Sequence, residues 1–106
     1  MTDKTALKPP PTLEELRAYR EEIIALARRN KAFNVRVFGS VARGDAHPDS
    51  DIDLLVEFEP DASLYDLSGL RLALMDLLGC DVDVVELHDH LRERFRSRVL
   101  ADAVLL

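Results

Sequence analysis

Residues 51–58, with the sequence DIDLLVEF, alternate between two kinds of side chain and predict a β-strand with two different faces. The polar face carries Asp51, Asp53, Leu55 and Glu57, and the apolar face carries Ile52, Leu54, Val56 and Phe58. On such a strand the carboxylates of Asp51 and Asp53 are about 6 to 7 Å apart, and they repel each other unless a cation or a proton intervenes. The pattern therefore predicts a strand that packs on helices with one face and holds a divalent metal with the other.

A second strand is predicted immediately upstream, where the sequence VRVF at 35–38 leads into Gly39 and Ser40. We expect a turn and a short helix over 39–44, followed by a polar loop over 45–50 that contains Pro48. Glycine lets a backbone approach a ligand closely, and this turn is typical of a segment that binds phosphate. A candidate phosphate site is thus followed closely by a candidate metal site.

A third strand is predicted at 82–87, and it also combines apolar residues with carboxylates. Asp81, Asp83 and Val85 share one face, opposite Val82 and Val84. A carboxylate in a strand otherwise made for the core needs a partner. If this strand lies beside the 51–58 strand, Asp83 completes a cluster of three carboxylates, and Asp81, two residues earlier on the same face, stays open as an alternative.

Helices alternate with these strands and complete the expected fold. The predicted helices span 12–30, where Thr12 and Glu15 form a capping box; 63–78, capped by Ser63 and Asp66 and stopped by Gly79; and 90–101. Residues 104–106 form a short extended tail, and Tyr19 and Tyr65 are interpreted as packing residues. This order predicts an α/β two-layer domain over 12–106 with a small mixed sheet, preceded by a flexible lead over 1–11 that ends in three prolines.

Composition narrows the function classes. The chain of 106 residues has 14 basic and 20 acidic side chains, a net charge of −6, which disfavours direct binding of nucleic acid. It has no apolar run of about 18 residues and no apolar segment typical of a secretory signal, so we expect a cytoplasmic protein without a membrane partner. The single Cys80 is expected to be a small buried apolar residue, and the histidines, His47, His88 and His90, lack the spacing of a zinc site.

Two familiar motifs fail on inspection. Residues 39–44 have the glycine spacing of a P-loop, but Asp45 stands where a lysine would neutralise phosphate. Asp49, Asp51 and Asp53 match the opening of an EF-hand loop, but Leu54 replaces its glycine and Pro60 its closing glutamate. The plainer interpretation remains open that Gly39 and Ser40 form an ordinary turn and that the acids are a solvated strand edge.

The combined pattern GSVARGDAHPDSDIDLLVEF, followed by VDVVEL, resembles the nucleotidyltransferase superfamily of DNA polymerase beta, and specifically its minimal nucleotidyltransferases. The resemblance covers roughly residues 12–105. It implies the polymerase beta-like fold and transfer of a nucleoside monophosphate from a nucleoside triphosphate, such as ATP, to a hydroxyl with release of pyrophosphate.

The resemblance also implies roles for individual residues. Gly39, Ser40, Arg43 and Gly44 would bind the nucleotide. Asp51, Asp53 and Asp83 would be catalytic and would hold two Mg²⁺ ions, with Mn²⁺ as an alternative, and Asp83 is the candidate base.

The same resemblance suggests a partner. Minimal nucleotidyltransferases resemble the antitoxin half of toxin–antitoxin pairs whose other half is a HEPN ribonuclease, and in that family AMP is transferred to a tyrosine of the toxin. The alternatives are a noncatalytic module that neutralises the toxin by contact alone, and transfer to a small molecule or to RNA. Leucine-rich helix faces over 67–78 and 91–106 predict either self-association or a helical partner. The sequence leaves the base preference, the acceptor hydroxyl and the oligomeric state open.

Overall fold

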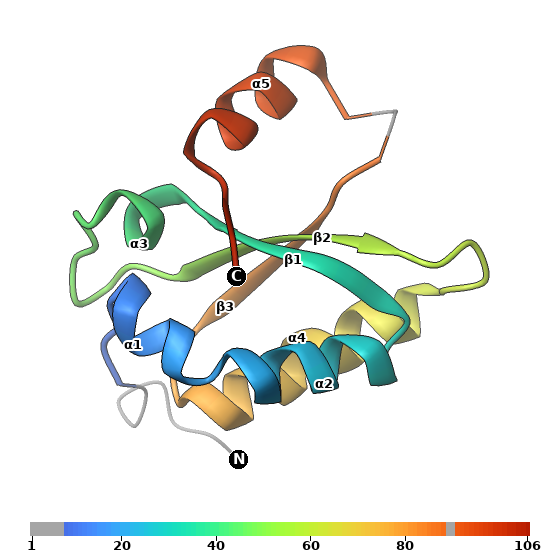
Figure 1. Ribbon diagram of the computed structural model, residues 1–106, viewed down its shortest axis with the longest axis horizontal. Helices are drawn as coiled ribbons and strands as arrows, with labels where there is room; N and C mark the ends of the chain where they lie inside the picture. The colour runs from blue at the N-terminus through green and yellow to red at the C-terminus, as the bar shows by residue number, and fades with distance from the viewer. Residues whose placement is uncertain (1–7, 89–90) are drawn as a thin grey trace.

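The computed structural model describes residues 8–88 and 91–106, and it confirms the predicted alternation of helices and strands (Figure 1). The elements are α1 (Leu13–Ala18), α2 (Arg20–Arg29), β1 (Ala32–Phe38), α3 (Gly39–Arg43), β2 (Ile52–Phe58), α4 (Leu64–Leu78), β3 (Val82–Glu86), α5 (Glu93–Asp102) and β4 (Val104–Leu105). Residues 1–7 of the expected lead over 1–11 and the expected helix start at His90 lie outside the described residues, and at the described end of that lead Lys8 N–H donates to Gly79 O at 2.7 Å.

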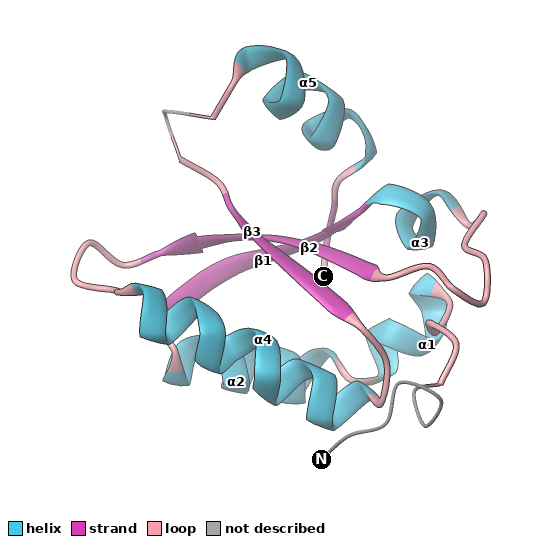
Figure 2. Ribbon diagram, turned by 180° about the vertical axis from the view of Figure 1, so that it is seen from behind, coloured by secondary structure: helices cyan, strands magenta, loops and turns pink. Residues whose placement is uncertain are grey.

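The sheet is mixed, with the strand order β3-β2-β1-β4. Strand β1 pairs antiparallel with both β2 and β4, whereas β2 and β3 run parallel. Helices α2 and α4 cover one face of this sheet, and α5 lies over the other face (Figures 1 and 2). The expected fold class, helices packed on a small mixed sheet, is therefore confirmed.

The core lies between the sheet and the α2 and α4 layer. Ile52, Leu54 and Val56 of β2 are fully buried there against leucine and isoleucine side chains of α1, α2 and α4. Leu55 is also fully buried but belongs to the opposite face by alternation, on the side of α5. Strand β2 is therefore covered on both faces, and its polar positions lie at the edge of a second, smaller packed region.

The first helix differs from its prediction. The capping box of Thr12 and Glu15 is present, but the helix is interrupted at Tyr19, whose N–H donates to Leu16 O at 3.0 Å in the tighter i to i−3 pattern. Tyr19 is 42% exposed and Tyr65 is 89% exposed, so the interpretation of both as packing residues was wrong. Helical spacing places a side chain on a face, but no neighbouring element covers these two positions.

The bounds of α3, β2, α4 and β3 agree with the sequence to within about one residue. Ser63 and Asp66 form the capping box of α4, and Gly79 ends that helix with a φ of 68°. Strand β1 begins three residues earlier than expected, because a bulge at Asn34, with a φ of 50°, lets the strand continue through a polar residue. Cys80 is buried as predicted, and no helix of the described residues is long and apolar enough to cross a bilayer.

Candidate active site

Asp53 and Asp83 are brought together by the parallel pairing of β2 and β3. The register places Asp53 directly beside Asp83, with Leu55 beside Val85 two residues later. Because Ile52 and Val82 point into the core, the side chains of Asp53 and Asp83 point to the opposite face, on the side of α5. The prediction for Asp83 depended on β3 lying beside β2, and the two strands are indeed neighbours.

Asp51 and Asp81 occupy different positions from these two. Asp51 precedes β2 by one residue and is exposed, yet it lies close enough to raise the pKa of Asp53. The Asp81 carboxylate accepts from Arg71 Nη2 of α4 at 3.4 Å, while its backbone carbonyl accepts from Ile52 N–H. The Asp81 side chain is thus paired with Arg71 of α4. The structure therefore favours Asp83 over Asp81 as the partner of Asp53.

Gly39 lies against the Asp53 carboxylate. This glycine joins β1 to α3 with a φ of 71°, and a Cβ at this position would collide with Asp53 Oδ2. Both constraints disfavour other residues, because most L-amino acids avoid this backbone region and because a side chain here would have to displace the Asp53 carboxylate. A glycine here is therefore required by the way α3 begins beside the carboxylate.

The remaining predicted nucleotide-binding residues lie in or directly after α3. Ser40 is partly buried in the first turn, and Gly44 ends the helix with a φ of 80°. Arg43 Nη1 donates to Asp102 Oδ2 at 2.9 Å, and Arg43 Nε donates to Asp45 Oδ2 at 3.3 Å. Hydrogen bonds to Asp102 and then to Asp45 raise the pKa of Arg43 above its ordinary value. Arg43 thus ties α3 to the end of α5.

The electrostatics of the site centre on Asp53. Burial, followed by the nearby carboxylates of Asp83 and Asp51, raises the pKa of Asp53 from 3.8 to about 6, and Arg43 opposes this effect. The cause is the one expected for carboxylates that crowd together on a partly covered surface. The free protein therefore holds a carboxylate that is poorly solvated and would be stabilised by a positive charge.

This donor set fits a hard divalent cation. Carboxylate oxygens are the ligands that Mg²⁺ and Mn²⁺ prefer. Among the described residues no group of three histidine, cysteine or acidic side chains is close enough to hold a metal unaided. Mg²⁺ usually takes one or two carboxylates and completes its coordination with substrate phosphates and water, so a site of two paired carboxylates matches a metal that arrives with a nucleotide.

A surface cavity of about 420 Å³ opens next to α3, between that helix and the chain at 10–14. Arg43 and Gly44 line it, but none of the three aspartates does. The cavity therefore adjoins the predicted nucleotide-binding residues without containing the acidic centre. His47 is exposed in the nearby loop, where its backbone N–H donates to Ser50 Oγ at 2.9 Å.

Two ion pairs on the α5 side of the sheet were not predicted from the sequence. Asp102 lies 59 residues from Arg43 in the sequence, and no local sequence pattern predicts this ion pair. Arg36 of β1 forms an ion pair of 3.5 Å with Glu57 of β2, on the face of Asp53. The alternation of β2 did place Glu57 on the polar face, but the partner could be identified only once the order of the strands was known.

Comparison with known proteins identifies the family. A model of the nucleotidyltransferase domain matches residues 16–106. Protein adenylyltransferase MntA of Thermococcus cleftensis is 39% identical over 98 residues, covering 88% of this chain and 94% of that protein. The chain belongs to the nucleotidyltransferase domain family and is a nucleotidyltransferase.

Solved structures narrow the resemblance within the family. A structure named as a minimal nucleotidyltransferase matches with a TM-score of 0.79 and 51% identity, over 91% of this chain and 97% of that chain. A crystal structure of a toxin–antitoxin complex with AMP-PNP contains a chain that matches with a TM-score of 0.67 and 29% identity, over 80% of this chain and 69% of that one. The fold is thus that of the minimal, polymerase beta-like nucleotidyltransferases.

Proposed function

We propose that this nucleotidyltransferase transfers AMP from ATP to a hydroxyl of a partner protein, in a reaction that depends on Mg²⁺ or Mn²⁺. The acceptor we propose is a tyrosine of a HEPN ribonuclease toxin, which the chain would neutralise as its antitoxin. The names of the relatives support the transfer to protein and the toxin–antitoxin setting. The observation that carries the chemistry is the direct pairing of Asp53 with Asp83 beside Gly39.

The proposed reaction is an in-line displacement at the α-phosphorus of ATP. The acceptor oxygen forms a bond to this phosphorus, the bond to the bridging oxygen breaks, and pyrophosphate leaves with the electron pair. The proton of the acceptor hydroxyl goes to a carboxylate, for which Asp83 is the candidate because it is the more exposed member of the Asp53 pair. A bound divalent cation would be held by Asp53 and Asp83 together with phosphate oxygens, with Asp51 as the third ligand if the cation draws it in, and would neutralise charge on the carboxylates and phosphates.

The α3 segment provides the nucleotide side of the proposed site. Gly39 allows close approach of the backbone, and the Ser40 hydroxyl can donate to a phosphate oxygen. Arg43 can add a cation for the triphosphate if it exchanges an ion pair with Asp45 or Asp102 for a phosphate. That exchange costs little, because exposed ion pairs contribute about 0 to 1 kcal/mol. Gly44 ends the helix so that the following loop can turn back toward β2.

The test is transfer in vitro with a matched pair of variants. The chain is incubated with each of the four nucleoside triphosphates, Mg²⁺ and the purified product of its neighbouring gene, and the products are analysed by mass spectrometry. Asp53→Asn should abolish transfer, whereas Asp81→Asn should retain it because that carboxylate is engaged with Arg71. Equal activity of the wild type and Asp53→Asn would overturn the assignment of the site.

Neutralisation by contact alone is the second candidate, and exposed apolar residues favour it. Leu64, Tyr65 and Leu72 of α4 are 78%, 89% and 62% exposed and share one side of the helix, so they form an apolar surface that a partner could cover. The two candidates differ in one measurement: the inhibition of the ribonuclease by Asp53→Asn. Loss of inhibition supports neutralisation by transfer, and full inhibition supports neutralisation by contact.

A further inference from the structure

Helix α5 is the most basic segment of an acidic chain. Residues 92–98 contain four arginines and one glutamate and therefore carry a charge of +3. Because the whole chain has a net charge of −6, the other residues together carry −9. All four arginines are exposed, and none of them forms an ion pair within residues 8–88 and 91–106. These charges are not needed for the fold, since the buried contact of the helix is made by Val99.

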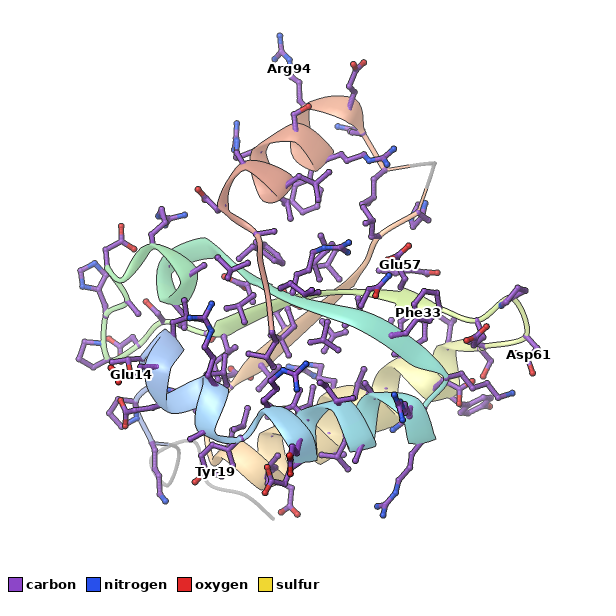
Figure 3. All side chains as sticks on the ribbon, in the orientation of Figure 1. Glu14, Tyr19, Phe33, Glu57, Asp61 and Arg94 are labelled. Atoms are coloured by element: carbon purple, nitrogen blue, oxygen red, sulfur yellow. The ribbon has the colours of Figure 1, made fainter. Side chains whose placement is uncertain are left out.

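The orientation of α5 is fixed by its last turn. Asp102 pairs with Arg43 of α3, and Arg94, Arg98 and Asp102 recur every four residues. Side chains at this spacing are neighbours on a helix surface, so the two arginines form a ridge that starts at the α3 contact and extends along α5. The ridge is about 12 Å long from Asp102 to Arg94. Arg94 points away from the sheet into solvent at the outer end of the helix (Figure 3).

This ridge lies on the side of the molecule where the candidate active site opens. The side chains of Asp53 and Asp83 point to the sheet face that α5 covers, and α3 begins at the Asp53 carboxylate. A group that docks on α5 next to α3 is therefore held at the border of the site. Helices α2 and α4 lie on the other face of the sheet and cannot serve this purpose.

We propose that the Arg94–Arg98 ridge of α5 docks an acidic surface of the acceptor protein and thereby presents its hydroxyl to the site, an inference that rests on the proposed transfer to a protein. Charge complementarity identifies the occupant as anionic. A protein surface fits better than RNA, because a polyanion that extended past the ridge would meet the strongly negative remainder of the chain. Phe95, which follows Arg94 in the chain and flanks the ridge, is 40% exposed and would add an apolar contact of the kind protein interfaces have.

Three short peptides test this directly, each with one tyrosine and flanked by acidic, neutral or basic residues. Fluorescence anisotropy without nucleotide measures docking, and mass spectrometry with ATP and Mg²⁺ measures transfer to tyrosine. We expect the acidic peptide to bind about tenfold more tightly than the neutral one at low salt, with the difference lost as salt rises from about 0.05 to about 0.5 M. The double variant Arg94→Glu/Arg98→Glu should lose this preference.

The matched control reverses the same number of charges elsewhere. Arg28→Glu/Arg29→Glu alters two exposed arginines of α2, on the other face of the sheet, and should keep the preference for the acidic peptide. Both double variants should keep the rise in melting temperature that ATP and Mg²⁺ produce. The docking ridge is overturned if both double variants lose the preference for the acidic peptide equally, or if the α5 variant keeps it.

Two further outcomes separate the alternatives. An RNA oligonucleotide that binds in place of the acidic peptide, with binding lost in Arg94→Glu/Arg98→Glu, overturns the protein occupant and makes α5 a nucleic-acid surface. Equal transfer to all three peptides by the wild type, abolished by Asp53→Asn, overturns the docking ridge while the proposed function stands. Suppose that the acidic peptide binds but that ATP and Mg²⁺ neither raise the melting temperature nor give transfer to tyrosine. This result supports the docking ridge and counts against the proposed function.

Discussion

Replacement of Asp53 by asparagine should stabilise the metal-free protein. A pKa raised from 3.8 to about 6 corresponds to about 3 kcal/mol between the charged and neutral carboxyl. Because Asp53 is only partly buried, solvent screens the effect, and we expect about 1 to 2 kcal/mol. The asparagine side chain would keep the shape of the aspartate and remove the charge that burial, Asp83 and Asp51 oppose.

The pH dependence gives this prediction a sign that can be checked. The unfolded carboxyl loses its proton near pH 3.8 and the folded one near pH 6, so between these values the folded state binds more protons. The contribution of Asp53 to stability is therefore fully present below about pH 4 and is lost as the pH rises to about 6. The advantage of Asp53→Asn should be largest above this window and should shrink toward zero below it.

Urea unfolding in the presence of a chelator measures both effects. The wild type, Asp53→Asn and the control Asp81→Asn are compared at about pH 4 and about pH 7.5. Asp81→Asn should give no gain in stability, because its carboxylate is paired with Arg71. If Asp53→Asn is no more stable than the wild type at the higher pH, the electrostatic account of the site is wrong.

The same contacts support four smaller predictions. Gly39→Ala should cost about 1 to 2 kcal/mol in urea unfolding for its backbone conformation and should also abolish transfer by displacing Asp53, whereas Gly44→Ala, also at a positive φ but in open space, should cost similar stability without displacing Asp53. Ser40→Ala should weaken triphosphate binding by about 1 to 3 kcal/mol in calorimetry, and unchanged affinity would make Ser40 a turn residue. ATP with Mg²⁺ should raise the melting temperature of the wild type, and no rise at saturation would contradict the site. Light scattering should detect self-association or a complex with the helical partner, reduced by Leu72→Glu, and a strict monomer in both samples would refute the assembly prediction.

The sequence was sufficient for the parts of the site that depend on local periodicity. Period-two alternation placed Asp53 opposite Ile52 and Leu54, and the structure confirms this division of faces. The caps of α4 were equally predictable, because the hydrogen bonds of Ser63 and Asp66 close within three residues. In each case the interaction that fixes the structure lies within one element.

Long-range partners could not be predicted in the same way. Asp83 was placed beside Asp53 only on the condition that the two strands were neighbours, and an antiparallel or shifted pairing would have separated them. The pairing of Arg43 with Asp102 depends on how α5 crosses the sheet after β3, which no spacing in the sequence encodes. The same limit explains the exposed Tyr65, since an aromatic residue on a helix packs only if another element lies opposite.

The division of β2 between its two faces explains how so small a domain can hold a crowded acidic site. Ile52, Leu54 and Val56 complete the core on the side of α2 and α4, so the stability of the sheet does not depend on the residues that alternate with them. On the other side Leu55 is buried and anchors the covered part of the face, while Asp53, one alternation earlier, lies where that cover ends. The repulsion between Asp53 and Asp83 thus acts at the border of the packed region, where a bound cation and nucleotide can relieve it without any change in the core.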